Sequence, residues 1–306
     1  MDVLFAGSGE FGLPTLAALL DAGHKIVHVY SQPDRPAGRG KHFTPTPISQ
    51  FCLDKQIPLT RTEDVNIENF PAADLLVVIA FGQKLSERLA AHARLGSVNL
   101  HASLLPRWRG AAPINWAILS GDATTGNSVI RLAQRMDAGA ILAQAQTPIA
   151  ELETAGELHD RLAVAGAALM LDVIRELEAG RAVETSQDDA RVTLARKLNR
   201  DSARLGFAQP ADIVARQIRG LFPWPGCRVQ LVDPRGQPRA RLTLVRARPV
   251  DGAGEPGVVG PDGSVGCTAG GVEILEVLPD GKRIMPLAAF RNGHPWEPGM
   301  KLEGVA

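Results

Sequence analysis

The chain has 306 residues, enough for two domains, and its 45% hydrophobic and 22% charged residues are typical of a globular protein with a buried core. Its 33 basic and 33 acidic residues balance, which excludes a protein-wide field that attracts nucleic acid and leaves only local patches. The three cysteines are far apart and form no CxxC pair, which disfavours a disulfide framework or a zinc site. The N-terminus has no basic segment followed by a long apolar run. We therefore expect no signal peptide, no membrane span and a cytoplasmic location.

The first predicted elements are a strand at residues 2–6, a helix at 14–22 and a second strand at 25–30. The glycine turn between the first strand and the helix, residues 7–12, fits the GxGxxG pattern of dinucleotide sites. An acidic residue should then end the second strand, but Asp34 lies beyond it. An NAD(P) oxidoreductase is therefore an open but weakly supported alternative.

Residues 31–47 contain four prolines and two glycines, which excludes a helix interior or a central strand. We predict a long exposed loop, and such loops are usually functional or disordered. Arg35, Arg39 and Lys41 give it a positive charge that suits an anionic partner such as a phosphate backbone. A solvated surface loop without a partner is the alternative.

Polar side chains gather where a buried strand ends near residue 100. Asn99 and His101 are two residues apart, so they point to the same side of an extended chain. Ligands of open α/β sheets collect at the carboxyl ends of the strands. An amide and an imidazole there can hold a carbonyl oxygen that becomes negative during acyl transfer. The competing interpretation is an asparagine that closes a turn and a histidine at the surface.

The run NLHASLLPRWRGAAPINWAI (99–118), with GDATTG (121–126) and RMDAGAI (135–141), resembles the 10-formyltetrahydrofolate-dependent formyltransferases, and the resemblance covers nearly the whole chain. It implies that Asn99, His101 and Asp137 are catalytic, with folate as co-substrate and no metal. Asn99 and His101 would donate hydrogen bonds to the formyl oxygen, while Asp137 orients His101 and helps to remove the amine proton. The folate contacts that we expect are Phe81, Gly82, Ser103, Leu104, Leu105, Pro106 and Gly139. Gln83, Lys84 and Ser86 depart from the family pattern, so the resemblance does not assign the residues that line the pteridine ring.

The basic segment PDRPAGRGK (33–41) resembles the loop with which methionyl-tRNA formyltransferases of this family hold the acceptor end of initiator tRNA. This implies that Arg35, Arg39 and Lys41 bind tRNA and that the reaction formylates initiator Met-tRNA for translation initiation. A nucleotide-sugar N-formyltransferase with the same folate donor is the runner-up, since it shares the first motif but leaves the basic loop without a purpose. A non-catalytic RNA-binding protein is a further alternative.

The second half of the chain changes its pattern. Strands at 125–132 and 140–147 and a long helix at 154–177 are followed by a polar, irregular stretch. Beyond a helix at 210–221, short alternating strands separated by Gly, Pro and Asp predict a small β-barrel. The arginines of residues 234–250 predict either a basic strip or an edge strand guarded by cations.

These patterns together predict an α/β protein with a Rossmann-like, doubly wound sheet and a C-terminal OB-like barrel. We place the catalytic domain at residues 1–180, a linker at 181–204 and a tRNA-binding domain at 205–306. We expect the chain to act as a monomer.

Overall fold

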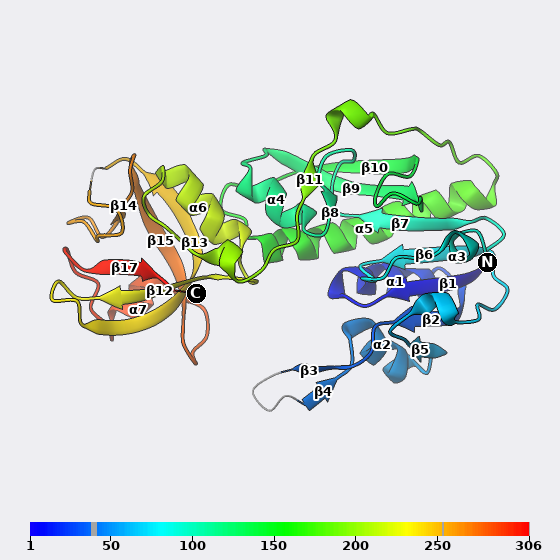
Figure 1. Cartoon of the computed structure of the whole chain (residues 1–306), viewed down its shortest axis with the longest axis horizontal. Coiled ribbons are helices and arrows are strands. Elements are labelled where there is room, and N and C mark those ends of the chain that lie inside the picture. Colours follow the sequence, from blue (N-terminus) through cyan, green and yellow to red (C-terminus); the bar gives the residue numbers. More distant parts are fainter. Residues whose placement is uncertain (38–41, 253, 306) are drawn as a thin grey trace. The chain divides into compact units, whose positions relative to one another are not determined.

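The structure, a computed structural model, describes residues 1–37, 42–252 and 254–305. The chain forms two compact units (Figure 1). Unit 1 comprises residues 1–110, 125–147 and 159–194, and unit 2 comprises residues 111–124, 148–158 and 195–306. No helix in the described part of the chain combines the length and apolar character that crossing a membrane requires.

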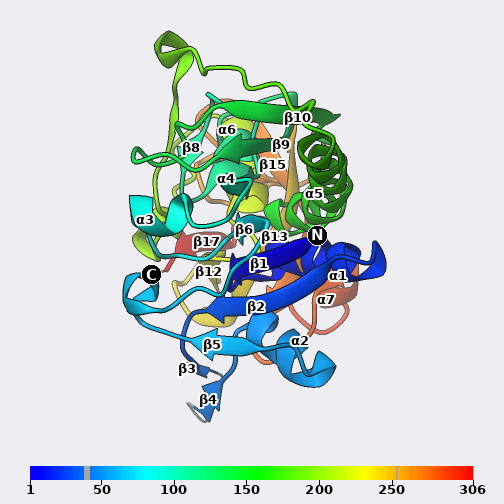
Figure 2. The ribbon, with the colours of Figure 1, turned by 90° about the vertical axis from the view of Figure 1, so that its right-hand side faces the viewer.

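Unit 1 is built on a seven-stranded sheet with the order β10-β9-β7-β6-β1-β2-β5 (Figure 2). Its strands are β1 (Asp2–Gly7), β2 (Lys25–Ser31), β5 (Leu59–Arg61), β6 (Leu75–Ile79), β7 (Ser97–His101), β9 (Thr124–Arg131) and β10 (Ile141–Pro148). Its helices are α1 (Leu13–Asp21), α2 (Pro47–Lys55), α3 (Glu87–Ala90) and most of α5 (Ala155–Glu178).

The centre of this sheet is parallel: β1 pairs with β2 and β6, β2 with β5, and β6 with β7, whereas β9 runs antiparallel to β7. Every residue of β6 is buried, which is expected of a strand covered on both faces. The chain places β2 and β5 on one side of β1, and β6 and β7 on the other. Because β1, β6 and β7 are parallel, their carboxyl ends lie together at the same end of the sheet. The predicted Rossmann-like, doubly wound sheet is confirmed.

The glycine turn after β1 is explained by close packing. A Cβ on Gly7 would lie 2.6 Å from the Phe5 ring and 2.8 Å from the carbonyl oxygen of Ile79. The Ser8 hydroxyl accepts the Gln32 N–H at 3.0 Å and donates to the carbonyl oxygen of Phe81 at 3.3 Å. The turn therefore ties together the segments that follow β2 and β6.

The basic segment is more regular than predicted. Strands β3 (Arg35–Ala37) and β4 (His42–Thr44) form an antiparallel ribbon, with Pro36 opposite Phe43. The prediction of an irregular loop was wrong for these two arms, because proline is compatible with an edge strand of a two-stranded ribbon. Arg35 is exposed on the first arm. Arg39 and Lys41 lie outside the described residues.

Unit 2 contains α4 (Pro113–Leu119), α6 (Ala211–Gly220), α7 (Leu287–Arg291) and an antiparallel sheet with the order β14-β15-β13-β12-β17. The strands are β12 (Cys227–Val232), β13 (Pro238–Val250), β14 (Val265–Gly266), β15 (Gly271–Pro279), β16 (Met285–Pro286), which pairs with β15, and β17 (Lys301–Gly304).

The edges of this sheet approach closure. Val258 bridges Lys301 of β17, and Val259 bridges Val265 of β14, so one short segment joins both edge strands. Alternate residues of β12 and β13, such as Val229 and Leu242, are fully buried in the core that α6 also covers. The predicted small barrel is confirmed, although the sequence did not reveal β16 and β17.

The arginines of β13 are largely neutralised by carboxylates from other segments. Arg246 donates to Glu157 at 2.6 Å and to Glu276 at 2.7 Å, and Arg248 pairs with Glu273 at 2.6 Å. Glu157 also closes a capping box at the start of α5, since Thr154 donates its backbone N–H and its hydroxyl to the carboxylate at 2.9 Å each. The strand therefore contributes less free positive charge than its sequence indicates.

The Glu157–Arg246 pair predicts a pH-dependent stability. The pKa of Glu157 is lowered from its ordinary value of 4.5 to about 2, mainly because its carboxylate accepts hydrogen bonds from Arg246. Because the folded-state pKa is the lower one, the contribution is fully present above about pH 4.5 and is lost as the pH falls towards 2. Solvent screens the half-exposed carboxylate, so we expect Glu157→Gln to lower the free energy of unfolding at neutral pH by on the order of 1 kcal/mol.

Urea unfolding of wild type and Glu157→Gln across the acid range measures this difference, with the exposed Glu255→Gln as control. The gap between Glu157→Gln and wild type should close with falling pH, and a gap that widens would contradict the assignment.

Candidate active site

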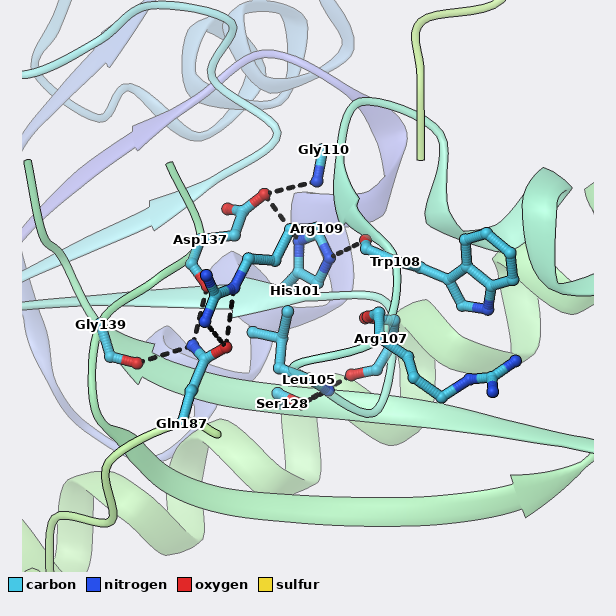
Figure 3. Close-up of polar contacts among 11 residues, drawn as sticks. His101, Leu105, Arg107, Trp108, Arg109, Gly110, Ser128, Asp137, Gly139 and Gln187 are labelled. Carbon is cyan, nitrogen blue, oxygen red and sulfur yellow. Dashed lines mark hydrogen bonds and ion pairs between the residues drawn. The ribbon is translucent and has the colours of Figure 1, made fainter. Parts of the chain in front are cut away.

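The site begins at the end of β7 with His101, which is 6% exposed. Its Nε2 lies 2.9 Å from the carbonyl oxygen of Trp108 (Figure 3). A carbonyl oxygen can only accept, so Nε2 carries a proton in this contact. The other nitrogen, Nδ1, faces Asp137, whose Oδ2 is 3.7 Å away. The Trp108 carbonyl thereby fixes which nitrogen is available for chemistry.

Asp137 comes from the loop between β9 and β10, in a left-handed conformation with φ of 53°. The backbone N–H of Gly110 donates to its Oδ2 at 2.9 Å, and the carboxylate side chain is 14% exposed. This hydrogen bond fixes the orientation of the carboxylate. The structure thus brings the predicted residues His101 and Asp137 together from separate segments.

Asn99 lies one pleat before His101 on β7, opposite Ile130 of β9, and is half-buried. Residues two apart on a strand share one face, so the Asn99 amide is on the side of His101. Within the described residues its side chain has no hydrogen-bond partner. Its N–H donors are therefore available to a ligand.

The loop after β7 carries four of the predicted folate contacts, Ser103 to Pro106. Hydrogen bonds within the loop and to Ser128 of β9 stabilise it. Ser103 donates its hydroxyl to the carbonyl oxygen of Arg107 at 2.7 Å, so this group is occupied in holding the turn. Ser128 donates to the Ser103 carbonyl oxygen at 2.6 Å and accepts the Leu105 N–H at 3.0 Å. These bonds hold the loop, and with it the Trp108 carbonyl, against the sheet.

Two residues of the site were missed by the sequence interpretation. Gln187 donates to the carbonyl oxygens of Asp137 and Gly139 at 2.7 and 2.8 Å, and its own amide oxygen accepts two bonds from Arg109 (Figure 3). Arg109 lies inside the long motif and is 5% exposed. Gln187 lies in the predicted linker, where the sequence carries no periodic signal for it.

A cavity of about 760 Å³ lies beside the Asp137 loop, lined by residues 84–87, 90–91 and 132–135. This volume is typical of small-molecule sites. Phe81 and Gly82, both predicted folate contacts, form the turn that leads into this wall. Gln83, whose role the sequence did not assign, stabilises the turn. Its amide accepts the Val65 N–H and donates to the Thr62 carbonyl oxygen, both at 2.7 Å.

The lining suits a flat, partly apolar ligand. Leu85 and Leu132 give it an apolar surface, Lys84 contributes a positive charge and Glu87 a negative one. Arg135, also in the lining, pairs with Asp189 at 2.6 Å. Ser86 also lines the cavity, and its buried hydroxyl has no hydrogen-bond partner in the structure. Such an orphaned group favours a ligand that brings a polar atom. The described part of the chain holds no group of three His, Cys, Asp or Glu side chains placed to bind a metal ion.

Gly139 yields a prediction, because the backbone leaves no space for a side chain there. A Cβ would lie 1.8 Å from the carbonyl oxygen of Arg131. We expect Gly139→Ala to displace the loop that carries Asp137 and to lower the free energy of unfolding by about 2 kcal/mol or more. Thermal unfolding measures this, with Gly206→Ala as control since nothing lies within 4 Å of its added Cβ. Equal melting temperatures for both variants would contradict the predicted clash.

Family models place the chain clearly. The "Formyl transferase" model matches residues 1–174, and the "Formyl transferase, C-terminal domain" model matches residues 197–295. The methionyl-tRNA formyltransferase of Phenylobacterium zucineum is 41% identical over 99% of this chain and 100% of its own. That of Halorhodospira halophila is 41% identical over 97% of both chains.

Solved structures share the fold at low identity. The N-formyltransferase from Helicobacter canadensis, in complex with folinic acid and dTDP-3-aminofucose, superposes with a TM-score of 0.66 at 15% identity, over 89% of this chain and 98% of its own. HypX from Aquifex aeolicus, in complex with tetrahydrofolic acid, gives a TM-score of 0.62 at 16% identity over 94% of this chain, which spans 46% of that protein. With two matching domain models and relatives 41% identical over the full length, the chain belongs to the formyltransferase family.

Proposed function

We propose that this protein is a methionyl-tRNA formyltransferase, which moves the formyl group of 10-formyltetrahydrofolate to the α-amine of methionine on Met-tRNA. The observation that carries the proposal is the meeting of His101 with Asp137 beside the unpartnered amide of Asn99, in a chain whose full-length relatives carry that name. The cavity beside the Asp137 loop is where we place the folate donor. Its unpartnered Ser86 hydroxyl and its apolar Leu85 and Leu132 fit a flat ring system with polar atoms, such as a pteridine.

The Asn99 amide is proposed to stabilise the charge that develops on the formyl oxygen when the amine attacks. A preorganised donor aimed at such an oxygen is worth roughly 3 to 4 kcal/mol in the transition state. The His101 Nδ1 can be a second donor only in the imidazolium form, because in the neutral ring the proton lies on Nε2, which is bonded to the Trp108 carbonyl.

The Asp137 carboxylate is proposed to help take the proton that the amine loses, either directly or through a water. It can serve in this way because its Oδ2 is held by the Gly110 N–H and faces the His101 Nδ1. The carboxylate holds the proton that the amine loses, and a proton is delivered to N10 of the folate as the C–N bond to the formyl carbon breaks and tetrahydrofolate leaves. The chain needs no covalent acyl intermediate for this step, since the Ser103 hydroxyl is bonded to the Arg107 carbonyl.

The β3–β4 ribbon is the surface that we assign to the tRNA acceptor end. Arg35 is exposed, and Phe43 on the opposite arm is 74% exposed, a combination of cation and aromatic that suits phosphate and unpaired bases. We extend the assignment to Arg39 and Lys41 from the sequence motif alone. We further propose initiator tRNA as the acceptor, action as a monomer because one chain supplies the whole set of candidate residues, and a cytoplasmic location where translation takes place.

A nucleotide-sugar N-formyltransferase is the second candidate. The Helicobacter canadensis enzyme shows that the fold can carry that chemistry, but at 15% identity the likeness concerns the fold alone. Sugar nucleotides would also leave the exposed ribbon of Arg35 and Phe43 without a partner. Activity on an amino-sugar nucleotide instead of Met-tRNA would move the protein to this class.

Substitutions at the centre test the chemistry. Asn99→Ala removes a transition-state donor, and we expect kcat for formyl transfer to fall about 10²- to 10³-fold. Asp137→Asn keeps the shape of the side chain but removes its basicity, so we expect kcat for this variant to fall by at least 10²-fold. Single-turnover transfer from 10-formyltetrahydrofolate to charged tRNA measures both variants, with thermal unfolding as a check of folding. Near-normal turnover in either variant would show that the centre lies elsewhere.

Arg39→Ala tests the acceptor surface. A phosphate-contacting arginine contributes to tRNA affinity and to its salt dependence, so kcat/KM for Met-tRNA should fall at least tenfold while folate binding is unchanged. Arg175→Ala is the matched control, because Arg175 lies on α5 and pairs only locally with Asp172. Equal kcat/KM values for the two variants would remove Arg39 from the tRNA site and leave the chemistry intact.

A further inference from the structure

We propose that Gln187 is a positioning residue that holds Asp137 in its working conformation, with Arg109 as its support. The inference rests on the proposed function, since it assigns Gln187 a part in the same centre. It adds a residue from beyond the family-matched segment of residues 1–174.

The Gln187 amide bridges both ends of the turn that presents Asp137. Its single nitrogen donates to the carbonyl oxygens of Asp137 at 2.7 Å and of Gly139 at 2.8 Å. An amide nitrogen has two N–H donors, so both are used. Asp137 adopts a positive φ of 53°, a conformation that a non-glycine residue keeps only where its surroundings hold it. Gln187 supplies such a hold on the backbone.

Arg109 fixes the orientation of this amide. Its Nε and Nη2 donate to the Gln187 Oε1 at 2.9 and 2.7 Å, and its Nη1 lies 3.0 Å from the Asp189 carboxylate. A guanidinium can only donate, so the amide oxygen must face Arg109 and the nitrogen must face the turn. Hydrogen bonds with Arg135 and Arg109 lower the pKa of Asp189, which keeps its carboxylate ionised beside the buried guanidinium.

The same short segment therefore holds Asp137 twice. Gly110, the residue after Arg109, donates its N–H to the Asp137 carboxylate at 2.9 Å, while Arg109 reaches the Asp137 carbonyl through Gln187. Residues 109–110 thus hold both the side chain and the backbone of Asp137. They directly follow Trp108, whose carbonyl oxygen binds His101. The distance between His101 and Asp137 depends on this common support.

The test compares Gln187→Ala and Gln187→Glu with wild type. Glutamate keeps the shape and still accepts from Arg109, but it cannot donate to the two carbonyls and instead repels them. We expect both variants to lose about 10- to 100-fold in kcat, with KM for both substrates nearly unchanged. Gln187→Ala should also lower the melting temperature, because the buried Arg109 loses two hydrogen bonds, whereas Gln187→Glu keeps this partner. Gln209→Ala is the control: it loses one amide-to-carbonyl bond, to Gly206, within unit 2, and should keep wild-type kcat.

A double-mutant cycle with Asp137→Asn separates positioning from general stability. If Gln187 acts through Asp137, adding Gln187→Ala to Asp137→Asn should lower kcat by less than about twofold. Wild-type kcat in Gln187→Glu, or fully multiplicative losses in the cycle, would overturn the positioning role. Near-normal turnover of Asp137→Asn alone would instead overturn the proposed function, so the two failures are distinguishable.

Discussion

The hydrogen bond from the Gly110 N–H to the Asp137 carboxylate is the contact on which the geometry of the candidate site depends. It joins the segment that follows β7 to the loop that follows β9, which Arg109 and Gln187 also bridge. The parallel part of the sheet delivers Asn99 and His101 to one edge, but Asp137 comes from the antiparallel flank. The Gly110 amide, together with the Gln187 bridge, thus holds a carboxylate from this flank beside the imidazole at the edge of the parallel sheet.

The sequence predicted those parts of the fold that depend on local pattern. The alternation of strands and helices in the first part of the chain predicted a doubly wound sheet, and short strands separated by Gly, Pro and Asp predicted the barrel. It did not reveal β16 or β17, because each is short and becomes a strand only through pairing with a distant partner. The ribbon of β3 and β4 was missed for a related reason, since its prolines indicate a loop unless the pairing is known.

The site was predictable where residue type and spacing carry the chemistry, and not where a neutral side chain acts through backbone atoms. Asn99, His101 and Asp137 stand out because of the motif around them, whereas Gln187 lies in a polar stretch where any glutamine looks like surface. The pairing of charges was also not visible in the sequence. Residues 234–250 contain no acidic residue, yet Glu157, Glu273 and Glu276 reach Arg246 and Arg248 from other segments.

The contacts of Gln187 and Asp189 also bear on the order in which the chain can assemble its site during synthesis. All three candidate catalytic side chains precede residue 140, yet the buried guanidinium of Arg109 meets its amide and carboxylate partners only when residues 187 and 189 are present. Until that stretch has left the ribosome, the Arg109 guanidinium lacks the amide and the carboxylate that bind it in the folded chain. A fragment cut at residue 180 would contain every residue of the motif and still leave the Asp137 turn without its amide clamp.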